Sequence, residues 1–213
     1  MNCNGIVIDY VVVGPVQTNC YIVYPQNSME CIIIDPGADA EGVVSLLREK
    51  GLTAKGILLT HGHFDHILGL EELRAAVRVE TYIGEEEKQL LESPDLNCSM
   101  MGAGVAASCH ADCYLKDGQS FELAEMKIQY LHTPGHTKGS GCYYFKESGF
   151  VLSGDTIFFE SLGRTDLPTG NGRMIVKSVE EKLMTLPDSV MLFPGHGPET
   201  TVGYEKKNNI FLR

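Results

Sequence analysis

Short apolar runs separated by turn residues dominate the first third of the chain. The runs are rich in β-branched and aromatic residues, and turn signals such as Gly14-Pro15 and Asp35-Pro36-Gly37 separate them. This combination is typical of β-strands and less so of helices. The strands predicted in this part of the chain are 6–13, 20–24, 31–34 and 56–59.

Other segments repeat their apolar residues at the spacing of a helix. In 41–50 the apolar positions 43, 44, 46 and 47 share one face, and Gly51 provides a stop. Segment 67–77 shows the same spacing, whereas 85–92 is highly charged and is predicted to be a surface helix. The predicted helices are 41–50, 67–77, 85–92 and 174–186.

The second half of the chain returns to the strand pattern. Its predicted strands are 121–123, 127–131, 141–145, 150–152 and 190–193, and one further strand is predicted before them, at 79–83. Between them, 93–113 has no clean period and contains Met100, Met101, Gly102 and Gly104, which predicts a mobile loop of the kind that often borders an active site. Strands therefore alternate with helices in two successive groups. We predict an α/β protein in which two sheets pack face to face with helices outside.

The charge balance narrows the range of partners. Lys and Arg together number 17 against 28 Asp and Glu, which gives a net charge of −11. Phosphate backbones and anionic membrane surfaces repel such a chain, so we expect no nucleic acid and no membrane as a partner. A length of 213 residues fits one domain, as a monomer or a small homo-oligomer. Neither a signal peptide nor an apolar run of about 20 residues, as a membrane span needs, is present.

The cysteines are scattered along the chain, and their number, seven, is odd. Without an export signal, this pattern predicts reduced thiols and a cytoplasmic location. Cys109 and Cys113 flank His110, but a second ligand pair at zinc-finger spacing is missing, so we do not interpret them as a metal site.

Histidines gather in the segment Thr60-His61-Gly62-His63-Phe64-Asp65-His66. Three of the seven histidines in the chain stand here around one aspartate, which core packing does not explain. Imidazole nitrogens and carboxylate oxygens are common ligands of zinc, iron and similar ions. His61 and His63 can point the same way from a turning backbone, while Asp65 and His66 begin the next helix and can face a second ion. The segment therefore predicts a metal site.

Three later segments can supply further ligands, each directly after a predicted strand. His132-Thr133-Pro134-Gly135-His136-Thr137 is a rigid turn, and Ser153-Gly154-Asp155 presents a carboxylate. Pro194-Gly195-His196-Gly197-Pro198 presents a last histidine. Polar residues at the carboxyl ends of strands are how open α/β folds build their sites. We expect these side chains to meet the histidines of segment 60–66.

Taken in order, H-x-H-x-D-H, T-P-G-H-T, G-D-T and G-H-G resemble the motifs of the metallo-β-lactamase superfamily. Within it the chain is most similar to hydroxyacylglutathione hydrolases (glyoxalase II) and their short relatives. The resemblance covers nearly the whole chain, including Gly163-Arg164-Thr165-Asp166 and the ending 200–206. It implies a four-layer αβ/βα sandwich with a site between two mixed sheets. It also implies one domain over 1–213, without the extra C-terminal helical region of full-length glyoxalase II.

The same resemblance assigns a ligand set to each of two metal ions. Three imidazoles would bind the first ion, two imidazoles and a carboxylate the second, and one carboxylate would bridge them. In that order, the sets are His61, His63 and His136; Asp65, His66 and His196; and Asp155. The expected cofactor is two divalent metal ions, with zinc as the first choice and iron or manganese as alternatives.

An open two-metal site of this kind suits hydrolysis. Two ions roughly 3.5–4 Å apart can share a water and lower its pKa toward about 7. The resulting metal-bridging hydroxide can attack a thioester, whose leaving group needs no strong general acid. We expect cleavage of a small-molecule thioester resembling a hydroxyacyl-glutathione, with Asp65 orienting the ligands and the nucleophile.

Three polar residues outside the ligand set have weaker assignments. Arg164 is a candidate for binding a substrate carboxylate, because a guanidinium matches it in a two-point contact. An ion pair between Arg164 and Asp166 is an equally good interpretation. His132 is expected to hydrogen-bond a ligand or its own turn, and His110 to be an ordinary loop residue.

The main alternative is an oxidoreductase, a persulfide dioxygenase with a single iron. That class uses residues matching His61, His136 and Asp155, and it resembles the chain at 163–166 as well. A zinc β-lactamase is disfavoured because Asp155 stands where the common ones have cysteine, and a tRNA-processing nuclease because the chain is acidic and short. A non-catalytic scaffold is disfavoured by the open coordination. Glutathione itself is in doubt, because the family residues that contact it have no clear match after Asp155.

Overall fold

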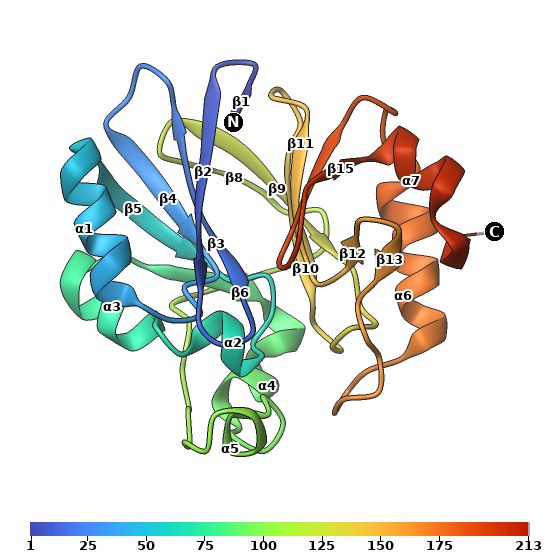
Figure 1. Ribbon diagram of the computed structural model, residues 1–213, viewed down its shortest axis with the longest axis horizontal. Coiled ribbons are helices and arrows are strands. Elements are labelled where there is room, and N and C mark those ends of the chain that lie inside the picture. Colours follow the sequence, from blue (N-terminus) through green and yellow to red (C-terminus); the bar gives the residue numbers. More distant parts are fainter. Residues whose placement is uncertain (213) are drawn as a thin grey trace.

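Four layers make up the protein, helices on the outside and two sheets between them, in a computed structural model that describes residues 1–212 (Figure 1). The first sheet has seven strands in chain order, with antiparallel pairing from β1 to β4 and parallel pairing from β4 to β7. Its strands are β1 (Asn2–Cys3), β2 (Ile6–Val13), β3 (Thr18–Pro25), β4 (Glu30–Ile34), β5 (Thr53–Leu58), β6 (Thr81–Gly84) and β7 (Cys113–Leu115).

The second sheet comes from the later part of the chain. Its order is β15-β14-β11-β10-β9-β8, and only the pairing of β11 with β14 is parallel. Its strands are β8 (Ser120–Leu123), β9 (Met126–His132), β10 (Gly141–Phe145), β11 (Phe150–Gly154), β14 (Met191–Pro194) and β15 (Thr200–Thr201). A separate hairpin pairs β12 (Ile157–Phe158) with β13 (Ser161–Leu162).

Helices cover the outer face of each sheet. Helices α1 (Ala40–Lys50) and α3 (Leu70–Val77) pack on the first sheet. The second is covered by α6 (Gly172–Ser178), the π-helical turn η2 (Val179–Leu183) and α7 (Val202–Asn208). The other helical segments are α2 (Phe64–Ile67), η1 (Glu85–Glu87), α4 (Lys88–Glu92), α5 (Ser99–Gly102) and η3 (Ile210–Leu212). Within residues 1–212, no helix is long and apolar enough to cross a membrane, and the seven cysteines form no disulfide.

Strand β4 shows why the strands of the sheets are continuous apolar runs in the sequence. Ile33 faces the layer of α1 and α3, whereas Ile32 and Ile34 face the second sheet. A strand with helices on one side and a sheet on the other is buried on both faces, so both sets of alternating positions must be apolar. The predicted α/β class, with two mixed sheets and helices outside, is confirmed.

Two predicted helices differ from the observed ones, the first because of a contact with a distant turn and the second because of a local cap. Segment 67–77 is interrupted, because Gly69 donates its N–H to the carbonyl of Pro36 at 2.9 Å, and a Cβ at Gly69 would lie 2.7 Å from that same oxygen. The helix predicted over 174–186 begins earlier, as α6 at Gly172. The reason is that the Asn171 side chain accepts from the N–H groups of Arg173 and Met174. Helix α7 was not predicted, since its seven residues carry too short an apolar pattern.

The contact between the two sheets is testable at Phe150. This side chain is fully buried and stacks on Phe145, with ring centroids 4.3 Å apart. Phe150→Ala is expected to lower the free energy of unfolding by about 3–5 kcal/mol in urea denaturation, because it leaves a cavity between the sheets. Val12→Ala, at a position 55% exposed, serves as the control and should cost no more than about 0.5 kcal/mol. Equal losses for both variants would contradict the packing described here.

Candidate metal centre

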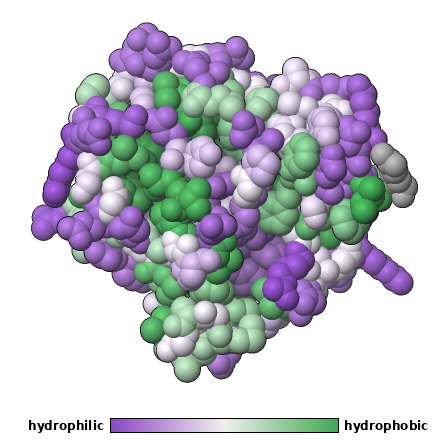
Figure 2. Space-filling model, in the orientation of Figure 1, coloured by the Kyte–Doolittle hydropathy of each residue, from purple (hydrophilic) through white to green (hydrophobic). Residues whose placement is uncertain are grey.

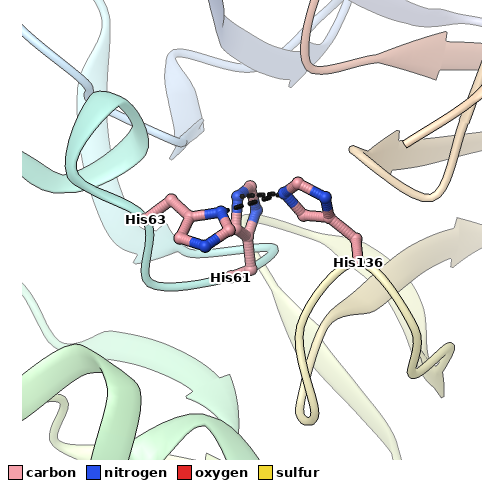
Figure 3. Close-up of side chains that lie close together, drawn as sticks. All are labelled: His61, His63 and His136. Atoms are coloured by element: carbon pink, nitrogen blue, oxygen red, sulfur yellow. Dashed lines mark hydrogen bonds between the residues drawn. The ribbon is translucent and has the colours of Figure 1, made fainter. Parts of the chain in front are cut away.

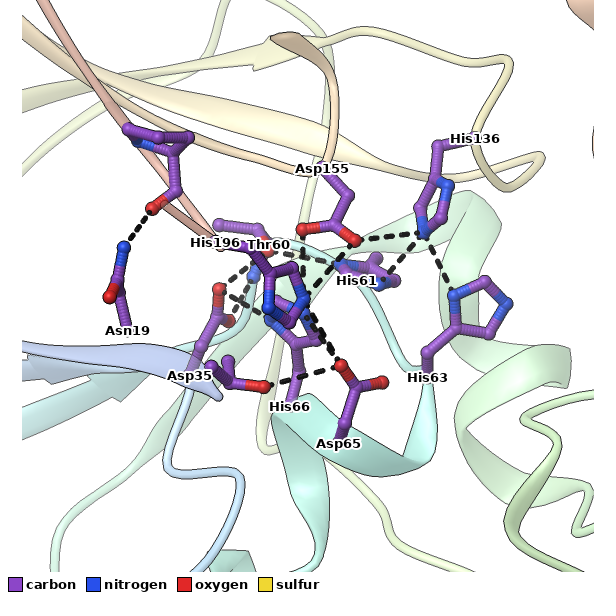
Figure 4. Close-up of polar contacts among 12 residues, drawn as sticks. Asn19, Asp35, Thr60, His61, His63, Asp65, His66, His136, Asp155 and His196 are labelled. Carbon is purple, nitrogen blue, oxygen red and sulfur yellow. Dashed lines mark hydrogen bonds and ion pairs between the residues drawn. The ribbon is translucent and has the colours of Figure 1, made fainter. Parts of the chain in front are cut away.

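All seven predicted ligands lie together where strands of both sheets end (Figure 4). The loop after β5 and helix α2 present four of them, and the segments after β9, β11 and β14 present one each. The seven are His61, His63, Asp65, His66, His136, Asp155 and His196. Most of these side chains are buried, and His196 is the most open to solvent.

Three imidazoles form the first group, and their rings point toward one another (Figure 3). Nε2 of His136 lies 3.2 Å from Nε2 of His61 and 2.9 Å from Nδ1 of His63. Two nitrogens bound to one tetrahedral zinc at about 2.05 Å would lie roughly 3.3 Å apart. The spacing of the three nitrogens is therefore close to what a single ion requires.

Neighbouring groups orient two of these rings. Thr60 donates its hydroxyl proton to Oδ2 of Asp35 at 2.7 Å. The hydroxyl oxygen of Thr60 can therefore accept from Nδ1 of His61, which lies 3.1 Å away. Nδ1 of His136 donates to the backbone carbonyl of Arg164 at 2.7 Å. Each contact keeps the proton on Nδ1 and directs the lone pair of Nε2 into the cluster, as a metal-binding imidazole requires.

A carboxylate and two imidazoles form the second group. Oδ2 of Asp65 lies 3.2 Å from Nε2 of His196 and 3.5 Å from Nε2 of His66. Their outer nitrogens face oxygens: Nδ1 of His196 donates to the carbonyl of Gln17, and Nδ1 of His66 lies 3.0 Å from Oδ2 of Asp35. Both Nε2 atoms therefore point toward Asp65.

Asp155 lies between the two groups. Its Oδ2 is 3.4 Å from Nε2 of His136 in the first group and 3.6 Å from Nε2 of His196 in the second. Its Oδ1 is 3.5 Å from Nε2 of His66. One carboxylate thus reaches both sets of possible ligands.

The residues fit a metal ion by the chemistry of their unsatisfied atoms. Nε2 of His66 and Oδ1 of Asp155 are buried and have no hydrogen-bond partner within the described part of the chain. A buried polar atom without a partner is costly, and few such atoms occur in native proteins. Both are ligand atoms for zinc, iron or manganese, so a divalent ion would satisfy them.

Burial and neighbouring charges give histidines of the first and second groups different protonation states. Burial lowers the pKa of His61 well below its ordinary value and that of His63 to about 3, which keeps both rings neutral. Burial also opposes a charge on His66, but the carboxylates of Asp65 and Asp155 raise its pKa well above the ordinary value. Burial also opposes a charge on His196, but the hydrogen bond to Asp65 and the charges of Asp155 and Asp65 together outweigh burial and raise its pKa. The second group therefore retains protons at neutral pH.

Asp35 is a residue of the site that sequence reasoning missed. It is buried and holds the left-handed conformation, with φ +52°. Its two oxygens accept from the N–H and the hydroxyl of Thr60, at 2.8 and 2.7 Å. In the sequence, Asp35-Pro36-Gly37 was interpreted only as a turn. Asp35 also stands directly after a predicted strand, as Asp155 does, and that position could have marked it as a residue of the site.

Glu87 corrects the prediction of a charged surface helix over 85–92, because its side chain is fully buried. One oxygen accepts from the N–H of Gly62 at 3.0 Å and from the hydroxyl of Thr137 at 2.8 Å, and the other from the N–H of Gly139 at 2.8 Å. Burial raises its pKa to about 7, although these three donors act in the opposite direction. Glu87 therefore connects the loop of His61 and His63 to the turn of His136.

The loop of His196 is attached to the other sheet in a similar way. Asn19 on β3 donates to the carbonyls of Pro194 and Gly197, at 3.0 and 2.9 Å, and Tyr21 donates to Pro194 at 2.7 Å. Gly195 has no space for a side chain, since a Cβ there would lie 2.3 Å from Oδ1 of Asp155. The close approach of this loop to the cluster therefore requires glycine.

A cavity of about 690 Å³ opens over the cluster, and Arg164 is among its lining residues. The guanidinium makes a two-point contact with Asp166, at 2.7 and 2.8 Å, and both side chains are exposed. His132 lies outside this cavity, where Nε2 contacts the carbonyl of Lys138 in its own turn at 3.0 Å. His110 is exposed on a loop beside Arg74.

Comparison with known proteins shows which family this chain matches and which proteins it is similar to. Residues 13–196 match the family model described as the metallo-beta-lactamase superfamily. The chain is 40% identical to the "Probable metallo-hydrolase YqgX" of Bacillus subtilis over 94% of each chain. It is 33% identical to the "Hydroxyacylglutathione hydrolase GloC" of Haemophilus influenzae, over 96% of this chain and 97% of the relative.

Two crystal structures have nearly the same fold. That of BLEG-1 B3 metallo-beta-lactamase has a TM-score of 0.92 and 37% identity, over 97% of this chain and 99% of the other. That of TTHA1623 in a di-iron-bound form has a TM-score of 0.84 and 34% identity, over 96% of this chain and 100% of the other.

The role of Glu87 can be tested with Glu87→Gln. An amide would turn its NH2 group toward the N–H of Gly139 or Gly62, leaving a buried donor without an acceptor. The free energy of unfolding of the metal-free protein should fall by about 1–3 kcal/mol in urea denaturation. Glu86→Gln is the matched control, because Glu86 is exposed and pairs with Lys138. A loss no larger than that of the control would show that Glu87 does not hold the two loops together.

The raised pKa values of His66 and His196 predict proton release on metal binding. A ring whose pKa is raised holds its proton at neutral pH, and an ion must displace that proton to reach Nε2. Zn²⁺ titrated into the weakly buffered metal-free protein at pH 7 should acidify the solution, and the apparent affinity should rise with pH. The control is the same addition to protein already saturated with Zn²⁺. Binding without release of protons would contradict this charge distribution.

Proposed function

This chain belongs to the metallo-beta-lactamase superfamily, and from that premise we propose that it is a two-metal hydrolase that cleaves small-molecule thioesters. The observation that carries the proposal is the position of Asp155, within 3.6 Å of nitrogens from both ligand groups. A carboxylate in that position is what a pair of ions sharing one bridging ligand needs. The di-iron form of TTHA1623, which is similar over 96% of this chain, supports the same number of ions.

In this proposal each ion has its own three ligands. His61, His63 and His136 hold the first, and Asp65, His66 and His196 hold the second. When bound, such ions supply Lewis acidity, which lowers the pKa of a water toward about 7 and polarises a carbonyl oxygen. We assign zinc as the first choice, with iron or manganese as alternatives.

Asp65 is the proposed catalytic residue because it both lines the cavity and belongs to the second group. Burial opposes its ionisation, but His66 and His196 together outweigh burial and lower the pKa of Asp65, so its carboxylate is charged. Thr18 donates to its Oδ2 at 3.2 Å and limits its rotation. A fixed, charged carboxylate at the cavity floor can accept a hydrogen bond from the attacking water and align it with the substrate carbonyl.

Thioesters are the proposed substrates for a chemical reason. A thiolate is a good leaving group, so the reaction does not require a strong acid beside the cluster. The named activity of the relative from Haemophilus influenzae, a hydroxyacylglutathione hydrolase, supports this class of bond. Arg164 is proposed to contact the substrate at the cavity mouth, which requires it to exchange Asp166 for a substrate group.

A single-iron dioxygenase would use only His61, His136 and Asp155. It would leave the second group without a function, although all three of its members are charged by their neighbours and Nε2 of His66 has no hydrogen-bond partner in the described part of the chain. The whole cluster is therefore better explained by two ions.

Metal analysis with kinetics tests the proposal. We expect about two zinc, iron or manganese ions per chain, loss of thioester hydrolysis on chelation, and recovery when the metal is restored. Asp65→Ala and His63→Ala should each lower kcat by at least about 100-fold. His110→Asn, on an exposed loop, is the control and should keep full activity.

Two outcomes would overturn this function. Undiminished turnover by Asp65→Ala would exclude a role for the second group. About one iron per chain, together with oxygen uptake in the presence of a persulfide, would favour the dioxygenase.

A further inference from the structure

The walls of the cavity over the cluster are apolar on both sides. Its lining outside the seven clustered residues is mainly aliphatic and aromatic, and it comes from segments that are far apart in the chain. The apolar wall residues are Val16, Phe64, Met101, Phe158, Leu162 and Leu167. Members of the cluster line the same cavity, so a substrate carbonyl that reaches the cluster lies among these apolar side chains.

Charged groups that could bind an anionic substrate are scarce around this cavity. Apart from the clustered histidines, Arg164 is the one cationic side chain among its lining residues, and Asp166 already neutralises it in a two-point contact. The chain as a whole carries a net charge of −11. Apart from the cluster, Ser161 supplies the one hydroxyl of the lining, so a polar acyl group would find few partners here.

One wall is held rigidly. The hairpin of β12 and β13 turns at Glu160, whose N–H donates to the buried carboxylate of Glu205 on α7. Asn209 donates both to this carboxylate and to the carbonyl of Ser161. The wall that carries Phe158 and Leu162 is therefore formed before any substrate arrives.

Neighbouring phenylalanines on this hairpin have different surroundings. The ring of Phe158 lines the cavity, 6.1 Å from the ring of His196. The ring of Phe159 stacks on Tyr204 with centroids 5.1 Å apart, away from the cavity lining. This pair provides a wall residue and a control residue with the same side chain.

The opposite wall is more adaptable. Helix α5 lies on the ring of Phe64, since a Cβ at Gly102 would be 2.4 Å from that ring. Met101, on the same helix, is 74% exposed although it lines the cavity. Figure 2 shows apolar surface over the part of the molecule where α4 and α5 lie. An unbranched methionine can fit apolar groups of different shapes.

We propose that the substrate is a thioester whose acyl group is apolar and larger than acetyl, packed between the rigid hairpin wall and helix α5. The inference rests on the proposed thioester hydrolysis and adds the class of acyl group. The acyl group lies next to the cluster, where the walls are apolar. The thiol part leaves toward the open side, where Arg164 and Asp166 are solvated.

The test uses the metal-loaded enzyme and thioesters of one small uncharged thiol, N-acetylcysteamine, with acetyl, propanoyl, butanoyl, hexanoyl and lactoyl groups. Each kcat/KM is divided by the rate constant of hydroxide-catalysed hydrolysis of the same compound. We expect this ratio to rise roughly two- to fourfold per methylene over the first few carbons. Propanoyl and lactoyl differ by one hydroxyl, and propanoyl should have the higher ratio.

Variants locate the effect in the wall. Phe158→Ala should lower kcat/KM for the hexanoyl thioester by roughly tenfold, mainly through KM, and change that for acetyl by no more than about twofold. Phe159→Ala should leave both values unchanged. Metal content, measured for each variant, shows whether the cluster is intact.

The outcomes separate this inference from the function on which it rests. No cleavage of any thioester would refute the proposed function itself. Cleavage with a ratio that is flat or falls with chain length, or that favours lactoyl over propanoyl, would refute the apolar acyl group alone. An equal loss for acetyl and hexanoyl in Phe158→Ala, with metal retained, would also refute it.

Discussion

The structure depends on holding imidazoles and carboxylates together in a buried space. Nitrogens and oxygens of the cluster lie 2.9–3.6 Å apart, and each loses hydration on burial. A surrounding set of hydrogen bonds fixes them, in which Asp35 acts through Thr60 and the carbonyls of Arg164 and Gln17 each accept from one ring. Four of the five rings, those of His61, His66, His136 and His196, thus have one nitrogen toward a protein group outside and one toward the cluster. Protein groups alone are sufficient to orient these four rings.

The cluster also joins two parts of the molecule that come from different stretches of the chain. His61 to His66 follow strand β5 of the first sheet, whereas His136, Asp155 and His196 follow strands of the second. Hydrogen bonds fix the loops after these strands relative to one another. Glu87 connects the loop of His61 to the turn of His136, and Asn19 attaches the loop of His196 to the first sheet. Free energy of metal binding is consequently linked to the packing of the two sheets.

In the proposed function, chemistry and selectivity are carried by different parts of the site. The ligand cluster sits on the ends of buried strands, and its motifs match a whole superfamily. The cavity walls come from a short hairpin, helix α5 and connecting loops, which can change without disturbing the strands. A shared reaction mechanism and a substrate preference of its own can thus coexist in one fold.

Local patterns in the sequence were sufficient for the strands of four or more residues, most helices and the seven clustered residues, whereas the shorter strands were not predicted. Alternation, turn residues and the histidine-rich segment 60–66 depend on neighbours in the chain, and each sits where its pattern predicts. The tertiary structure alone decided the rest. Glu87 looks like part of a charged surface in the sequence but is buried by contacts with residues 25 and more positions away, and Gly69 interrupts a helix because the turn at Pro36 packs against it. Likewise, the apolar walls exist only where separate segments meet. Long-range contacts of this kind leave no periodic signal in the sequence, so the ligand set could be predicted from it, while its supports and the shape of the cavity could not.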